Sequence, residues 1–107
     1  MKVYTAQFGY READRLDITV KLGEKAFAPT WDMVMGYKKG ELSEVQYKEL
    51  YLERMRRSYV ANRAIWNEIL KRDRVVFVCF CRKGEFCHRV LLAKIFEKLG
   101  AEYGGEI

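Results

Sequence analysis

The chain has 107 residues, of which half are hydrophobic and a third are charged, and its formal net charge is +5. This length and apolar content suit a single folded domain over residues 1–107 and argue against a disordered chain. The sequence has no apolar run of about 20 residues and no basic leader before an apolar stretch, so we expect a cytoplasmic protein rather than a membrane or secreted one.

The positive charge is concentrated in the second half of the chain. Residues 54–89 contain ten Lys and Arg residues against three Asp and Glu residues, a local balance of +7. Such a basic stretch indicates an anionic partner, either a small molecule or a nucleic acid. The alternative is a solvated, thermophile-like surface, which the high charge and the low Asn and Gln content also favour.

Two β-strands are predicted near the N-terminus. Residues 2–8 contain several β-forming side chains and are followed by Gly9. Residues 16–22 alternate apolar and polar side chains, which is the period of a half-buried strand near a sheet edge. Gly23 ends this second segment.

Three helical segments follow. Thr30 is a candidate N-cap for a short helix over residues 31–38. Ser43 and Gln46 match a capping box at the start of a long helix, and a further helix covers residues 61–71. The apolar stripe of the long helix is expected to comprise Val45, Tyr47, Leu50, Tyr51, Leu52 and Met55.

The strongest strand signal is the unbroken apolar run at residues 75–80, which is typical of a strand buried on both faces. A charged turn leads from it to an amphipathic helix that Gly100 ends, and residues 101–107 can add a short strand. This order of elements predicts an α/β fold: a small single-domain sandwich with a mainly parallel sheet of about four strands flanked by helices. The 75–80 strand is expected to be central.

The turn after the apolar strand is the candidate functional site. In α/β proteins, ligands bind at the carboxyl ends of parallel strands, where a helix N-terminus offers unpaired N–H groups. Arg89 lies in the first turn of the helix, where its charge opposes the helix dipole and favours an anion or a carboxylate facing it. Arg82 and Lys83 add positive charge. We therefore expect a phosphorylated or nucleotide-like ligand, with Cys87 or His88 as the reactive or orienting group.

The cysteines leave further alternatives open. A cysteine at a helix N-terminus beside Arg has a lowered pKa, so Cys87 is a candidate nucleophile with His88 as its base. Cys79 and Cys81 are two residues apart on a strand and should share a face. With Cys87 and His88 they provide zinc-ligand types, but not the paired spacing of structural zinc sites. A disulfide between Cys81 and Cys87 is another alternative. The cysteines can also have no chemical role and serve only as small apolar side chains in the core.

A second group of polar side chains follows the first predicted strand. Thr5 and Gln7 would line the same crevice if this strand lies beside the 75–80 strand, and they would then be secondary ligand contacts. Ordinary polarity of an exposed loop is the alternative.

The chain resembles the domain of unknown function 488 family, the YeaO-like group. The resemblance lies in blocks that span nearly the whole chain: Val3–Thr5 with Phe8 and Gly9, Asp17–Val20, Phe27–Trp31, Tyr37–Gly40, Tyr47 with Tyr51, and Cys79 with Cys87–Arg89. It implies an α/β fold with a residue cluster at the carboxyl end of a strand, and it supplies no established activity. Family members often have an acidic residue where this chain has Cys81, which places the emphasis on Cys87–Arg89.

Three functions remain open from the sequence. The first is a small enzyme or binding domain for an anionic ligand at Cys87–Arg89. The second is a nucleic-acid-binding or accessory protein without catalysis, which would use the basic stretch. The third is a cysteine-based redox or metal site. These residues point to no particular cofactor or oligomeric state.

Overall fold

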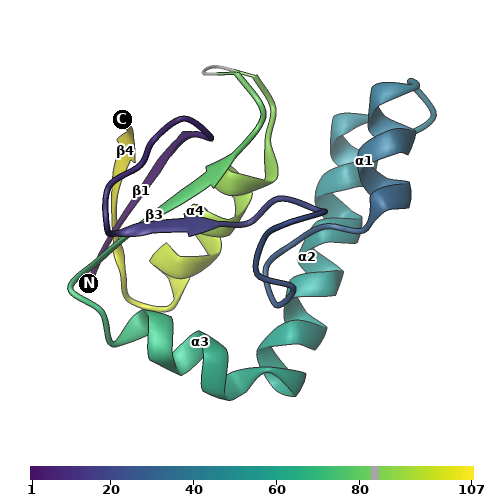
Figure 1. Cartoon of the computed structure of the whole chain (residues 1–107). Coiled ribbons are helices and arrows are strands. Elements are labelled where there is room, and N and C mark those ends of the chain that lie inside the picture. Colours follow the sequence, from purple (N-terminus) through teal and green to yellow (C-terminus); the bar gives the residue numbers. More distant parts are fainter. Residues whose placement is uncertain (83–84) are drawn as a thin grey trace.

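The structure is a computed structural model that describes residues 1–82 and 85–107. Figure 1 shows the arrangement of the elements in space. In chain order they are β1 (Lys2–Gln7), β2 (Arg15–Asp17), α1 (Trp31–Lys38), α2 (Glu44–Ala61), α3 (Arg63–Leu70), β3 (Arg74–Cys79), α4 (His88–Lys98) and β4 (Glu102–Glu106).

The four strands form one parallel sheet in the order β2-β3-β1-β4 (Figure 1). This confirms the predicted α/β fold with a parallel sheet of four strands and β3 in its interior. Residues 75–79 are all buried. Phe80 lies beyond the end of β3 and is 66% exposed, so the strand ends one residue earlier than predicted.

The two faces of β3 are covered by different parts of the chain. On one face Phe77 belongs to the main core, where it contacts Phe27 and Phe96. On the other face Val78 belongs to a smaller cluster, against which Phe8 and Tyr10 pack. These two side chains belong to the loop between β1 and β2, which lie on opposite sides of β3. The helices therefore bury one face of the central strand, and a loop buries the other.

The two predicted N-caps are confirmed, whereas the helix predicted over residues 61–71 covers only Arg63–Leu70. Thr30 is the N-cap of α1, and its side chain accepts a hydrogen bond from the backbone of Met33. Ser43 and Gln46 form the capping box of α2, with reciprocal hydrogen bonds of 3.1 and 2.8 Å. Each cap satisfies backbone N–H groups that have no partner inside the helix.

The predicted strand over residues 16–22 is wrong in extent, because β2 covers only Arg15–Asp17. The Asp17 side chain accepts a hydrogen bond from the backbone N–H of Thr19 at 2.8 Å, and Gly23 bonds back to the Thr19 carbonyl at 3.0 Å. Asp readily forms such local turns, which compete with strand pairing. Ile18 is buried, whereas Leu22 is 73% exposed.

The apolar stripe of α2 is narrower than predicted. Tyr47, Tyr51 and Met55 are buried, but Val45 and Leu50 are exposed. The buried positions follow one another at intervals of four residues, so they form a single line along the helix. None of the helices in residues 1–82 and 85–107 is both long and apolar enough to span a membrane.

Ser58 continues this line and connects three segments of the core. Its hydroxyl donates to the Ala26 carbonyl at 2.5 Å and accepts from the indole N–H of Trp66 at 3.0 Å. Asn62 donates to the same oxygen at 3.2 Å. Trp66 is fully buried, so this hydroxyl is what satisfies its only polar group.

Ser58→Ala should lower the free energy of unfolding by about 2–3 kcal/mol, because it leaves the Trp66 N–H and the Ala26 carbonyl without this partner in the core. Urea unfolding followed by Trp fluorescence and circular dichroism measures this change. Trp66→Phe should lower the free energy of unfolding less in the Ser58→Ala background than in the unmodified protein, because in that background it removes an N–H that has already lost its partner. Equal costs of Trp66→Phe in both backgrounds would contradict the coupling.

Candidate functional site

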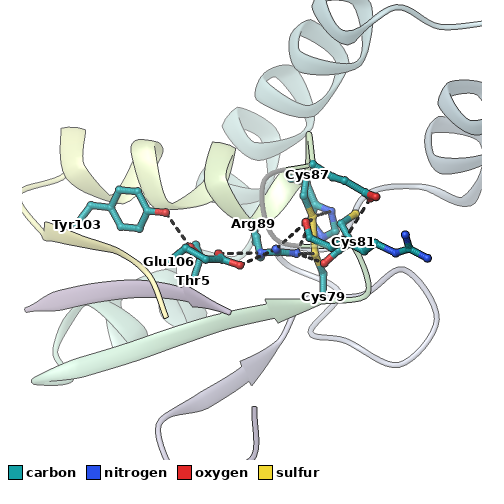
Figure 2. Close-up of polar contacts among 10 residues, drawn as sticks. Thr5, Cys79, Cys81, Cys87, Arg89, Tyr103 and Glu106 are labelled. Carbon is teal, nitrogen blue, oxygen red and sulfur yellow. Dashed lines mark hydrogen bonds and ion pairs between the residues drawn. A yellow bond between two sulfur atoms is a disulfide. The ribbon is translucent and has the colours of Figure 1, made fainter. Parts of the chain in front are cut away.

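The candidate site lies where the carboxyl end of β3 meets the start of α4. Cys79 is the last residue of β3, and Cys87 is the N-cap of α4. The sulfur atoms of Cys79, Cys81 and Cys87 all lie within 4.8 Å of one another. Figure 2 shows these three side chains next to Arg89. Cys81 lies beyond the end of β3 rather than on the strand as predicted, and the fold brings its sulfur to the same point as those of Cys79 and Cys87.

The structure joins the sulfurs of Cys79 and Cys87 in a disulfide and leaves Cys81 free (Figure 2). The alternative of a Cys81–Cys87 disulfide is therefore wrong. Cys79 is 1% exposed and points into the core where the N-cap of α4 packs, whereas Cys81 lies beyond the strand and is only partly buried. The Cα atoms of Cys79 and Cys87 are 7.9 Å apart, which is wider than the roughly 4.4–6.8 Å typical of disulfides.

Arg89 lies at the centre of the site and is 1% exposed. Its Nη1 donates to Cys79 Sγ at 3.0 Å and to the Cys81 carbonyl at 2.8 Å, and it also reaches Cys87 Sγ at 3.6 Å. On its other side, Nε and Nη2 donate to the two carboxylate oxygens of Glu106 at 3.1 and 2.7 Å. A buried charge is tolerated when it is paired and hydrogen-bonded in this way.

Glu106 is the functional residue that sequence reasoning did not identify. The position of Arg89 against the helix dipole predicts either a bound anion or a carboxylate facing it. In the structure the carboxylate is supplied by the end of β4, 17 residues further along the chain. The role of Arg89 as a ligand contact remains a proposal, and any ligand would share this guanidinium with Glu106.

The electrostatics of the three sulfurs differ. Burial raises the pKa of the Cys81 thiol, and the charge of Arg89 opposes this shift. Cys79 and Cys87 differ from Cys81 in that their sulfur atoms, rather than a backbone carbonyl, accept hydrogen bonds from the Arg89 guanidinium.

The two ring nitrogens of His88 face different groups, Nε2 the Ile18 carbonyl and Nδ1 the sulfur of Cys87. Nε2 lies 2.7 Å from the Ile18 carbonyl and must donate to it, because a carbonyl oxygen only accepts. Nδ1 lies 3.8 Å from Cys87 Sγ. Burial lowers the pKa of His88 to about 4, against the opposing effect of the Ile18 hydrogen bond. A neutral imidazole with this pKa is a weak base for Cys87 at neutral pH, and its main role in the structure is to tie α4 to residue 18.

The remaining predicted ligand contacts lie at different places. Thr5 is fully buried, and its hydroxyl shares a 2.7 Å hydrogen bond with the Tyr103 hydroxyl (Figure 2). Gln7 is exposed at the end of β1, opposite Cys79 in the sheet register. Arg82 is exposed, and its carbonyl accepts from Arg89 at 3.4 Å. Lys83 lies outside the described residues.

A hollow of about 620 Å³ opens beside the start of α4. Of the three cysteines, Cys87 is the one that lines it, together with Arg89 and Glu106. The rest of the wall comes from both helices and the preceding loop: Glu44, Val45, Lys48, Glu85, Phe86, Val90, Leu91 and Lys94. Cys87 is 4% exposed and forms part of this wall, Cys79 is 1% exposed, and Cys81 is partly buried and lies outside the lining of the hollow.

Comparison with protein families places the chain in a known family. Residues 2–100 match a family model described as "Active DUF488-N3 subclade". No curated protein and no solved structure matches the chain. The family model covers β1 through α4 and ends before β4, so Glu106 lies outside the matched residues.

Glu106→Gln should lower the free energy of unfolding by roughly 3 kcal/mol, because it leaves the buried guanidinium of Arg89 without a carboxylate. Thermal and urea unfolding measure the loss. Glu102→Gln, on the same strand but exposed, is the matched control and should change stability little. The double variant Arg89→Met with Glu106→Leu should recover part of the loss. A Glu106→Gln protein as stable as the control would show that the pair is not a stabilising contact.

The buried imidazole of His88 makes stability depend on pH. Between about pH 6.5 and the native pKa of about 4, the unfolded chain binds a proton that the folded chain does not. The free energy of unfolding should therefore fall by up to roughly 3 kcal/mol as the pH falls through this range, with no contribution from His88 above it.

His88→Gln keeps an N–H donor for the Ile18 carbonyl and cannot titrate. Its unfolding free energy, measured with a chelator present from pH 7.5 to pH 4, should show a smaller slope than that of the unmodified protein. Equal slopes in the two proteins would rule out His88 as the source of the pH dependence.

Proposed function

The chain belongs to the domain of unknown function 488 family, and for this member we propose a thiol–disulfide redox function in which Cys87 and Cys79 are the reacting pair. The observation that carries the proposal is the convergence of three sulfurs beside the Arg89 guanidinium, with one of them bordering an open hollow.

The proposed order of the steps follows from the lining of the hollow, to which Cys87 contributes and Cys79 does not. The Cys87 thiolate attacks one sulfur of a substrate disulfide from the hollow, which forms a mixed disulfide and releases the first substrate thiolate. The Cys79 thiolate, from behind, then attacks Cys87 Sγ and expels the second substrate thiolate. Two electrons pass from the dithiol to the substrate, and the protein is left with the Cys79–Cys87 disulfide. A second dithiol must reduce this disulfide before the next cycle.

Arg89 and the hollow define the class of substrate. Lys48 and Lys94 lie in the wall of the hollow, and Arg89 contributes its partly neutralised charge. These groups suit a small disulfide with carboxylate or phosphate groups. The expected anionic ligand at Cys87–Arg89 enters the proposal in this form, as the charged part of the substrate. Glu44 and Glu85 in the same wall suit a cationic group such as an amine, so a peptide-like thiol is favoured over a nucleotide.

Nucleic-acid binding by the basic stretch is the less favoured alternative. Arg56 and Arg57 both pair with Glu53, and the guanidinium of Arg63 lies 3.8 Å from the Tyr59 ring centroid. These exposed pairs are weak, so they do not prevent such binding. These basic side chains lie on α2 and α3, whereas the sulfurs lie between the end of β3 and the start of α4. Nucleic-acid binding and thiol chemistry would therefore be separate properties.

The proposal is tested by allowing the reduced protein to react with glutathione disulfide. The unmodified protein should release glutathione and acquire the Cys79–Cys87 disulfide, which mass spectrometry of the intact and digested protein detects. Cys79→Ser should stop at the mixed disulfide on Cys87, because the resolving thiol is absent. Cys87→Ser should form no mixed disulfide at a comparable rate.

Cys81→Ser is the matched control, since it removes a neighbouring sulfur and leaves the reacting pair in place. It should form the Cys79–Cys87 disulfide as the unmodified protein does. If the three cysteines were labelled equally before and after treatment, or if Cys81→Ser alone blocked the reaction, the proposal would be wrong.

A further inference from the structure

We infer that, in its reduced state, the protein binds a zinc ion through Cys79, Cys81 and Cys87. The sequence alone speaks against a structural zinc site, because the spacing of these residues is not that of a zinc knuckle. The fold overrides this objection by bringing three sulfurs from two sides of a turn to one point.

The geometry of the cluster suits a metal with thiolate ligands. Zn–S bonds of about 2.3 Å in a tetrahedral site place neighbouring sulfurs about 3.8 Å apart. The three sulfurs lie within 4.8 Å of one another, so small side-chain rotations can direct them at a common ion. The Cα separation of 7.9 Å between Cys79 and Cys87, wide for a disulfide, leaves room for an ion between the two side chains.

His88 does not complete the site in the described structure. Its Nε2 is hydrogen-bonded to the Ile18 carbonyl. Its Nδ1 lies 3.8 Å from the sulfur of Cys87 but does not belong to the group of ligand atoms within 4.8 Å of one another that the three cysteine sulfurs form. Three protein ligands leave the fourth zinc position open, which is the pattern of zinc sites that bind a water molecule or a substrate. Cys87 borders the hollow, so an exogenous ligand can approach from that side.

The charge balance favours zinc over a monovalent soft cation. Three thiolates carry a charge of about −3, which a divalent ion reduces to −1 and Cu(I) would reduce only to −2. Arg89 donates to Cys79 Sγ and lies near Cys87 Sγ, and its own charge is largely matched by Glu106. Because this buried region has little further positive charge to offer, the ion with the higher charge is better accommodated.

The zinc site rests on the proposed function only because it needs cysteines that can be reduced. Zinc binding and the Cys79–Cys87 disulfide use the same sulfurs, so the two states cannot exist in one molecule at the same time. When Cys79 and Cys87 each give one electron to a small disulfide, a new S–S bond joins the two cysteines, the substrate S–S bond breaks, and the substrate leaves as two thiolates that take protons from the solvent; zinc then loses two of its three ligands. The ion is then released. Reduction of the Cys79–Cys87 disulfide restores the site.

The test uses the full chain, reduced and freed of metal under anaerobic conditions, and titrated with Co²⁺ as a spectroscopic substitute for Zn²⁺. We expect a thiolate-to-cobalt charge-transfer band in the near ultraviolet that saturates at a single ion per chain and disappears when Zn²⁺ is added. The disulfide form should show no such band. Zinc content of the protein as purified under reducing conditions provides an independent measurement.

Cys81→Ser is the decisive variant, because Cys81 is a zinc ligand in this inference but is not needed for thiol exchange. It should weaken the affinity for zinc by roughly a hundredfold. The loss of a group that only hydrogen-bonds to a metal ligand lowers affinity by up to this factor, and Cys81 would be a ligand itself. His88→Gln is the control and should keep the charge-transfer band. Circular dichroism of both variants checks that they fold.

The outcomes separate the two proposals. Thiol exchange without a charge-transfer band or bound zinc overturns the metal site and leaves the redox function in place. A charge-transfer band without formation of the Cys79–Cys87 disulfide overturns the redox function and leaves the metal site in place. Zinc binding that persists unchanged in Cys81→Ser also overturns the three-cysteine site, because it would then come from other groups on the surface.

Discussion

The buried charge of Arg89 is the constraint on which the site depends. A guanidinium that is 1% exposed has lost its hydration, so its N–H groups need acceptors and its charge needs an anion. Glu106 supplies two of the acceptors and the negative charge, and Cys79 Sγ and the Cys81 carbonyl supply two more. These partners belong to β3, the following loop and β4. One side chain on α4 therefore connects the end of β3 and the loop that follows it to β4, and the sulfurs of Cys79 and Cys87 converge beside it.

The parallel sheet makes this arrangement reachable, because the carboxyl ends of its strands lie at one edge. β1 separates β3 from β4, and Thr5 lies opposite both Phe77 and Glu106 in the register. Two glycines before Glu106 permit its placement. A side chain at Gly104 would clash with the ring of Tyr4, and Gly105 has a φ of +98°, which other residues rarely adopt. The irregular register between β1 and β4 thus brings the carboxylate to Arg89.

Features with a local cause could be predicted from the sequence, and features set by long-range pairing could not. The caps at Thr30 and Ser43 and the buried strand that begins near residue 75 depend on neighbouring residues. Both caps are confirmed, and so is the strand, although it ends at Cys79 rather than at residue 80. The strand predicted at 16–22 ends early because the Asp17 side chain captures a backbone N–H, a competition that hydrophobic periodicity does not register. The dipole argument predicts an anion beside Arg89, but only the register of β4 identifies it as Glu106. Spacing likewise placed Cys79 and Cys81 on one face without revealing which of them meets Cys87.

Charge balance links the two chemistries proposed for the sulfurs. In the disulfide form the buried region contains Arg89 and Glu106, a matched pair, and two uncharged sulfurs. Reduction to thiolates adds negative charge to a region where the one nearby cation is already paired. A low-dielectric interior tolerates such charge only if protons or a cation enter with the electrons. The reduced site must therefore take up protons, which lowers its nucleophilicity, or a metal ion, which occupies its thiolates. Within the proposed function, oxidation to the Cys79–Cys87 disulfide releases these protons or this ion and returns the site to a matched Arg89–Glu106 pair beside two uncharged sulfurs.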